Sequence, residues 1–302
     1  MIREALTSLA RQPSVAGVLA RTPVARDVVS RVVGGEDVVN VLPLVTDLAD
    51  RGFHVALERV APGVDSLDRA EEARAGYAAL VDAVAAAGLA GVSEVTVFTE
   101  SLGQGLHGAD PWSALQQLSA QAREQRVALQ LGTGPLPDLE QALGWAQELV
   151  DRGDDIGVTL PAILRSTERT ALAWSDRRVR LVKGAHADGA DAYRQPIETD
   201  KAYVRCAKAL LRGSGQPSFA THDPRLIAIV ESLARRFDRP RHTYEFAFYL
   251  GRQTAEQERL LAEGEKVRIY VPYGERWLER LVAGLPEQPG GITGALRSLL
   301  PG

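Results

Sequence analysis

The sequence predicts a (βα)8 barrel, and two observations support this fold class. Eight short runs rich in β-branched and aromatic residues alternate along the chain with segments of helical periodicity. Regular alternation of strand and helix is typical of a parallel sheet, and eight such units are enough to close a barrel. The predicted strands span residues 53–58, 94–99, 126–131, 156–160, 179–182, 218–220, 242–248 and 266–271.

Helical segments separate these strands. Residues 69–87 are rich in alanine and amphipathic, and residues 111–125 and 200–211 each carry one apolar face. About fifty residues precede the first strand and are largely helical in pattern, with breaks at Thr22-Pro23 and Gly34-Gly35. We therefore expect an N-terminal helical segment, residues 1–50, followed by one barrel domain that binds the cofactor, residues 51–302.

Composition excludes several classes of protein. The net charge of -4 gives no reason to expect nucleic acid as a partner. Cys206 is the single cysteine of the 302 residues, so the chain forms no internal disulfide. Neither a signal peptide nor a run of about 18 apolar residues is present. These features predict a soluble, cytoplasmic protein with at most peripheral membrane contact.

Functional side chains of a parallel barrel stand at the C-terminal ends of its strands. The ends of the predicted strands supply, among others, Gln130, Lys183, His186, Thr221, His222, Glu245 and Tyr270. Two histidines with no carboxylate or cysteine nearby are weak evidence for a metal, and we expect no metal site.

Lys183, which ends a buried strand and precedes Gly184, has three interpretations. It acts as a Schiff-base nucleophile, as a cation facing phosphate, or as a solvated lysine at the barrel rim. A glycine next to it lets the backbone approach a ligand closely, which favours phosphate or a planar ring. The residues alone leave these interpretations open.

Three segments resemble signature segments of the proline dehydrogenase family. They are Arg-Leu-Val-Lys-Gly-Ala at residues 180–185, Ala-Thr-His-Asp at 220–223, and Tyr-Val-Pro-Tyr-Gly at 270–274, followed by Trp277. The resemblance implies a distorted barrel that holds FAD. It also implies transfer of a hydride from the carbon next to the ring nitrogen of proline to the flavin, and of electrons onward to a quinone.

The resemblance also assigns roles to residues. Arg180 would approach the flavin N5 and favour the reduced, anionic ring. Two alternatives remain open, because Arg180 could be an interior ion-pair partner and His222 a structural imidazole. The cofactor contacts that the resemblance implies are Arg180, Val182, Lys183, Gly184, Ala185, Thr221 and His222.

Residues on the substrate side depart from the family pattern. Phe98 stands where the family has a lysine, and Gln130 stands where it has an aspartate that could orient an ammonium group. His186 replaces a tyrosine. Pro161 falls at the position of a flavin-binding glutamine, and it has neither a side-chain donor nor a backbone N–H.

The last helix departs most. The family carries Trp-x-x-Tyr-x-x-Arg-Arg, and the arginine pair grips the carboxylate of the amino acid. Here the positions that correspond to the tyrosine and the two arginines of this pattern are Arg280, Ala283 and Gly284. Loss of this clamp removes interactions of about 1.5 to 3 kcal/mol each, so we expect inefficient oxidation of proline.

The cofactor segments persist while the substrate segments change, which predicts a flavin-dependent dehydrogenase acting on another substrate. We expect it to oxidise a C–N or N–N bond of a small amine or imino compound other than free proline, with a quinone or another acceptor. Alternatives are a non-catalytic flavin-binding homologue, a lysine aldolase acting through Lys183, and an authentic proline dehydrogenase. The candidate catalytic residues are Arg180, His186, Tyr270, Arg280 and Gln130.

Overall fold

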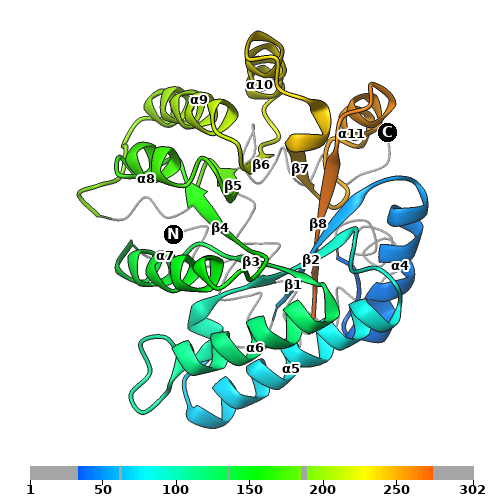
Figure 1. The fold of residues 1–302 in the computed structure, drawn as a ribbon, viewed down its shortest axis with the longest axis vertical. Helices are drawn as coiled ribbons and strands as arrows, with labels where there is room; N and C mark the ends of the chain where they lie inside the picture. Colours follow the sequence, from blue (N-terminus) through cyan, green and yellow to red (C-terminus); the bar gives the residue numbers. More distant parts are fainter. Residues whose placement is uncertain (1–32, 61–62, 135, 185–188, 275–302) are drawn as a thin grey trace, which may run out of the picture.

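The computed structural model describes residues 33–60, 63–134, 136–184 and 189–274. Its eight strands are parallel and close into a barrel, since each pairs with its neighbours in the chain and β1 also pairs with β8 (Figure 1). The strands are β1 (His54–Arg59), β2 (Ser93–Val97), β3 (Ala128–Leu131), β4 (Ile156–Pro161), β5 (Arg178–Val182), β6 (Gln216–Ala220), β7 (Glu245–Tyr249) and β8 (Val267–Tyr273). The predicted fold class is confirmed.

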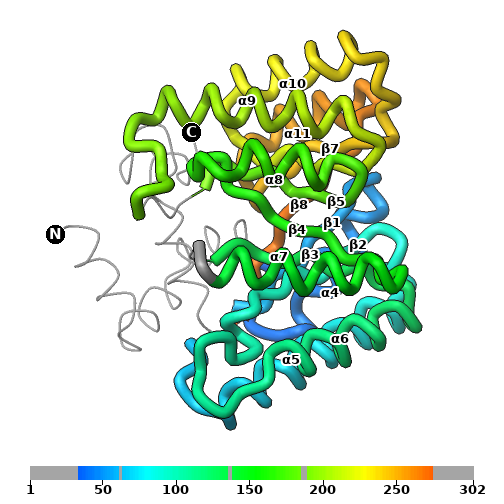
Figure 2. Tube along the Cα trace, turned by 60° about the vertical axis from the view of Figure 1, so that its left-hand side comes forward, coloured from blue at the N-terminus to red at the C-terminus, as the bar shows by residue number. Residues whose placement is uncertain are grey.

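Helices surround this barrel in the described part of the chain (Figure 2). They are α4 (Val38–Asp50), α5 (Leu67–Ala86), α6 (Pro111–Gln125), α7 (Leu136–Asp151), α8 (Thr167–Ala173), α9 (Pro196–Arg212), α10 (Pro224–Arg236) and α11 (Thr254–Ala262), with the short 3-10 turns η1 (Thr99–Leu102) and η2 (Arg241–Thr243). Three predicted strands were too long. Residue 99 begins η1, residues 126–127 precede β3, and residues 242–243 belong to η2.

Several helices begin where the sequence supplies a cap. Asp37, Ser66 and Asp110 each accept a hydrogen bond from the backbone N–H three residues later, at 2.8, 3.4 and 2.9 Å. Asp223 accepts from the Arg225 N–H at 3.0 Å. Proline at the first helical position of α6, α9 and α10 needs no N–H partner there. These local interactions thus determine the residue at which each of these helices begins.

The two faces of the strands differ sharply in polarity. Every second residue of a strand points outward, and these residues are apolar and pack under the helices. Val95 and Val97 of β2 are examples, and both are fully buried. The alternate residues project inward and contact one another across the barrel. Among these inward residues are Glu94, Thr96, Gln130, Thr159, Arg178, Arg180, Glu245 and Arg268. A barrel interior is commonly filled with aliphatic side chains, whereas this one is filled with charge.

Helix α4 packs against β1, β8 and α5, and its buried residues Val41, Val45 and Leu48 join the main apolar core. The chain just before it, residues 33–35, hydrogen-bonds to the end of β8 through Gly34 and Gly35. Residues 1–32 lie outside the described part, so the division at residue 50 stays a prediction. Within the described residues, no helix is long and apolar enough to cross a membrane.

Candidate active site

Three side chains from the three signature segments lie in one line of contacts at the C-terminal half of the barrel. The Arg180 guanidinium sits 5.3 Å from the centre of the Tyr270 ring. Tyr270 meets the edge of Tyr249 at 5.2 Å, and Tyr249 stacks on His222 at 5.5 Å with an angle of 13° between the rings. Arg180 on β5 and Tyr270 on β8, which are 90 residues apart in sequence, are thereby brought together. Tyr249 at the end of β7 and His222 just after β6 continue the line.

Tyr249, the residue that completes this line, was missed by the sequence analysis. Its signal was available, because Glu245, Ala247 and Tyr249 alternate along β7 and the last of them stands at the C-terminal end. Glu245 was expected at that end, and this was wrong. It is the first residue of β7, so its side chain belongs to the opposite half of the barrel.

Arg180 is 3% exposed and forms an ion pair with Glu94 of β2. Its Nη1 also lies 3.4 Å from the Thr96 hydroxyl. The interpretation of Arg180 as an interior ion-pair partner, left open by the sequence, therefore describes its contacts. The Nε–H of Arg180 is buried and has no hydrogen-bond partner among the described residues, so one donor remains for a bound group.

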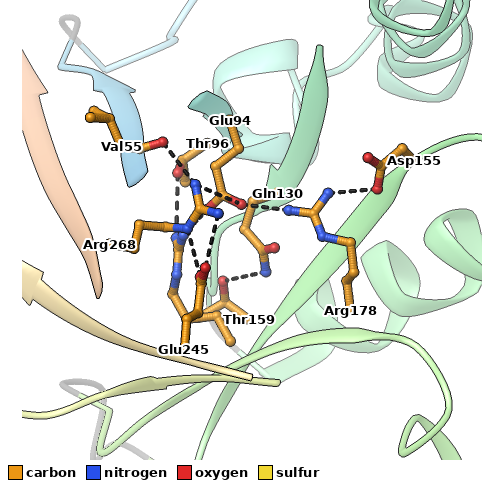
Figure 3. A network of polar contacts seen from close by, with 10 residues as sticks. Val55, Glu94, Thr96, Gln130, Asp155, Thr159, Arg178, Glu245 and Arg268 are labelled. Carbon is orange, nitrogen blue, oxygen red and sulfur yellow. Dashed lines mark hydrogen bonds and ion pairs between the residues drawn. The ribbon is translucent and has the colours of Figure 1, made fainter. Parts of the chain in front are cut away.

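Glu94 is shared by three arginines (Figure 3). Arg178 approaches its carboxylate at 2.5 Å, Arg268 lies 3.6 Å away, and Arg180 is the third partner. Arg178 also binds Asp155 at 2.6 Å. Glu94 was not among the predicted site residues, although its inward position on β2 could have indicated it.

Arg268 and Glu245 form the second ion pair of the interior, with distances of 2.6 and 3.0 Å between guanidinium nitrogens and carboxylate oxygens (Figure 3). Burial alone would raise the pKa of Glu245, but Arg268 outweighs it and lowers that pKa to about 2. Arg268 also donates to the Val55 carbonyl at 2.9 Å. Glu245 is therefore an anion at neutral pH.

Gln130 lies inside the barrel and is 3% exposed. Its Nε2 donates to the Thr159 hydroxyl on β4 at 3.3 Å (Figure 3). An amide at this position supplies hydrogen bonds but no negative charge, so it does not provide the charge that would attract an ammonium group.

His222 accepts a hydrogen bond at Nε2 from the backbone N–H of Tyr249, at 3.1 Å. Burial, aided by the nearby Arg252, lowers the pKa of His222 to about 4. The imidazole is therefore neutral at pH 7, and because Nε2 accepts, its proton is on Nδ1. Its neighbour Thr221 accepts at Oγ1 from the Asp223 N–H at 3.1 Å, which holds the turn into α10.

Lys183 stands at the rim just after β5 and contacts Asp200 of α9 at 2.5 Å. Asp200 lies 3.5 Å from Arg225, which in turn binds Asp223 at 2.6 Å. Two cations and two carboxylates thus alternate around this part of the rim. The Lys183 side chain is 38% exposed, so a phosphate group can approach it from solvent.

Gly184 is required by its backbone. Its φ is +97°, a left-handed conformation that favours glycine. A Cβ at this position would lie 2.7 Å from Ile163 and 2.8 Å from Pro161. The chain after β4 crosses closely here, since the Ala162 and Ile163 N–H groups donate to the Val182 and Lys183 carbonyls, each at 2.8 Å.

Pro161 is accommodated because it costs the sheet no hydrogen bond. The pairing of β4 with β3 ends at Val158, and on the β5 side the donor is Ala162, the next residue. Its carbonyl accepts from the Thr167 hydroxyl at 2.6 Å. The position still offers no donor to a ligand.

Phe98 follows β2 and its ring lies against Gly132, which follows β3. A Cβ on Gly132 would come within 2.5 Å of the ring carbon Cδ1 of Phe98 and 2.7 Å of Cζ. The Phe98 backbone N–H is held at 3.3 Å by the hydroxyl of buried Tyr77. The Phe98 ring after β2 thus occupies space that a side chain at Gly132, after β3, would need.

Three predicted site residues, Ala185, His186 and Arg280, lie outside the described residues, and so do Ala283 and Gly284. The described residues contain no group of three or more histidine, cysteine, aspartate or glutamate side chains that could hold a metal. Of the other predicted residues, Gln130 and Glu245 lie in the interior and line a cavity that opens at the N-terminal ends of the strands, and the rest lie toward the C-terminal ends.

The donors present suit a flavin cofactor on two counts. Lys183 and the backbone at Gly184 form a rim that can take phosphate, and Arg180 supplies a buried charge with an unused donor next to two tyrosine rings. Pro161 is the exception. The fold and this constellation together define a barrel enzyme whose candidate site lies at the C-terminal ends of its strands.

The chain matches the family model of proline dehydrogenase over residues 41–282. It therefore belongs to the proline dehydrogenase family, a family of flavin-dependent oxidoreductases. Proline dehydrogenase 2 of Bacillus subtilis strain 168 is 23% identical over 284 residues, 93% of each chain. Proline dehydrogenase of Deinococcus radiodurans is 26% identical over 310 residues, covering 100% of this chain and 99% of the relative.

Solved structures agree on the fold. The proline utilization A protein of Bdellovibrio bacteriovorus, inactivated by N-propargylglycine, superposes with a TM-score of 0.82 at 18% identity. That of Bradyrhizobium japonicum, in a mutant form, gives 0.74 at 19%. The present chain spans about a third of these proteins, 34% and 32% of their lengths, while 92% and 91% of it is covered.

Proposed function

We propose that this protein uses FAD to oxidise a C–N or N–N bond of a small amine or imino compound other than free proline. Membership of the family supports the reaction type, and the contact line Arg180–Tyr270–Tyr249–His222 supports a cofactor at the C-terminal end. The observation that carries the change of substrate is the Phe98 ring lying against Gly132. It presents an apolar wall where the family has a cation.

Bound flavin supplies a hydride acceptor at N5, and the residues of the chain do the rest. Lys183, Gly184 and Thr221 would hold the phosphates and the ribityl chain. Arg180 places a buried positive charge that favours a reduced, anionic ring. His222 remains a neutral donor through Nδ1, so it can hold a polar cofactor atom without adding a second charge.

The substrate side supports a compound with little need for charge recognition. Gln130 is an amide bound to Thr159 and does not supply the carboxylate that would attract an ammonium group. A substrate with a larger apolar part would gain about 25 cal/mol for each Å² buried against the Phe98 ring. This pocket favours a secondary amine or imine that bears an apolar group over a small zwitterion.

The first experiment is spectroscopic. The purified protein is expected to show flavin absorbance near the usual two visible bands or to bind added FAD, and secondary amines are then tested for anaerobic bleaching. A colourless protein that takes up no FAD would refute the enzyme proposal and favour a non-catalytic homologue, for which Pro161 gives a reason.

L-Proline is the second candidate substrate, because the relatives that match most of the chain are named proline dehydrogenases. Rapid bleaching by micromolar L-proline would establish it and would overturn the proposal of a different substrate. A Phe98→Lys variant provides the matched comparison. If Phe98 excludes a zwitterion, the flavin of this variant should be reduced faster by L-proline and more slowly by the apolar amine.

The aldolase alternative acts through Lys183 and is tested separately. Its amine contacts Asp200 at 2.5 Å and would have to leave that carboxylate to attack a carbonyl. Borohydride is expected to trap no carbonyl compound on Lys183. A trapped adduct at this lysine would contradict the flavin proposal.

A further inference from the structure

A cavity of about 470 Å³ opens at the N-terminal ends of the strands, at the opposite end of the barrel from the signature segments. Its volume lies in the range of small-molecule pockets, about 300 to 1,000 Å³. It reaches inward to Gln130 and to the charged network of Figure 3. Its outer part is lined by the chain that precedes β2, β3 and β8. This end of a barrel usually serves stability alone.

The charges that line the cavity do not balance. Three carboxylates are present, and each is already taken by an arginine, since Arg178 binds Glu94 and Asp155 while Arg268 binds Glu245. Two further cations, Arg126 and Lys266, line the cavity. Within the described part of the chain, neither side chain forms a salt bridge or a hydrogen bond.

Arg126 and Lys266 reach the opening from different strands. Arg126 precedes β3 and Lys266 precedes β8, with β1 and β2 between these strands. His54, the first residue of β1, faces the cavity between them. Burial, together with Arg268 and Lys266, lowers the pKa of His54 to about 4, so it is a neutral donor in a positive field.

We propose that this cavity binds a small oxyanion that carries two or more negative charges, with Lys266 and Arg126 as its main charge partners. A cation is disfavoured because every lining carboxylate is engaged. The chain as a whole has a net charge of -4, so an anion would be attracted by this local surplus and not by the overall field. Phosphate and small polycarboxylates share the required chemistry.

The test is calorimetric titration with inorganic phosphate and, separately, with citrate, at an ionic strength held constant with NaCl and with FAD present in excess. We expect saturable binding of one equivalent. Lys266→Gln and Arg126→Gln should each weaken it about tenfold, as the loss of one charge-assisted contact predicts. The probe that binds more tightly identifies the source of the oxyanion.

Lys208→Gln provides the matched control, because Lys208 is an exposed lysine on α9 away from the cavity. Its affinity should equal that of the unaltered protein. The inference is overturned if neither probe binds beyond the NaCl control, or if Lys266→Gln and Arg126→Gln bind as tightly as the unaltered protein. It is also overturned if binding is lost in Lys183→Gln, which would place the anion at the other end of the barrel. None of these results depends on a substrate.

Discussion

Replacing Glu94 with glutamine is expected to lower the free energy of unfolding by about 3 kcal/mol. The carboxylate is 2% exposed and faces the guanidinium groups of Arg178, Arg180 and Arg268. Gln keeps the shape of the side chain and one acceptor oxygen but removes the charge. The interior then holds three arginines against one buried glutamate, Glu245.

The magnitude follows from what each arginine retains. Arg178 keeps Asp155 at 2.6 Å, and Arg268 keeps Glu245 at 2.6 Å. Arg180 keeps no carboxylate, but it retains the Thr96 hydroxyl at 3.4 Å and the Tyr270 ring at 5.3 Å. Breaking a buried ion pair by removal of one partner costs about 3 to 5 kcal/mol. Because one arginine of three loses its only carboxylate, we expect the lower end of that range.

Urea denaturation followed by circular dichroism measures this change. Glu148→Gln is the control, since its contact with Arg152 at 3.9 Å is exposed and should contribute nothing measurable. The double variant Glu94→Gln, Arg180→Gln should recover part of the loss, because the unpaired charge is removed with its partner. A loss below about 1 kcal/mol for Glu94→Gln would refute the assignment of a buried, shared charge.

Three further predictions concern the site. The pKa of His222 falls from 6.5 unfolded to about 4 folded, so the unfolded state binds the extra proton and stability is lost as pH decreases through this window. Between pH 7 and 4.5 the loss should be about 2 to 3 kcal/mol larger than in His222→Gln, measured by urea denaturation at each pH. Gly184→Ala should lower the free energy of unfolding by about 1 to 3 kcal/mol, because of the positive φ of Gly184 and its close neighbours. Gly144→Ala in α7, where a Cβ would have no neighbour within 4 Å, should raise it by about 0.5 to 1 kcal/mol. Equal effects of the two substitutions in thermal melts would contradict the backbone argument. Gly132→Ala should destabilise by about 1 to 3 kcal/mol when Phe98 is present and by less in a Phe98→Ala background, and additive losses would mean that the two residues do not share space.

Much of the fold was predictable because its signals are local. The alternation of apolar residues in β2 and the caps at Asp110 and Asp223 are properties of a few consecutive residues. Errors occurred at the ends of elements. Thr99 continues a β-rich run, but it begins a 3-10 turn. That turn is held by hydrogen bonds from the Ser101 N–H to the Phe98 carbonyl at 3.0 Å and from the Gly103 N–H to the Glu100 carbonyl at 3.1 Å, which form only once the chain has turned.

The candidate site was predictable only in its own segments. Lys183, His222 and Tyr270 could be named because each stands at or near the end of a predicted strand, and Arg180 because its segment resembles a family signature. Glu94 and Tyr249 could not be identified as their partners, since a strand shows which residues share a face but not which strand lies opposite.

The sequence by itself therefore determined the barrel, the order of its strands and the family to which its three segments belong, because periodicity and motif are written along the chain. Only the tertiary structure decided the partners. Closure of the sheet brings β2 opposite β5 and sets Glu94 against Arg180, and it gathers Arg126 and Lys266 around one cavity. Glu94 and Arg180 are 86 positions apart in the sequence, and Arg126 and Lys266 are 140 positions apart. No local pattern encodes which residues come together over such separations.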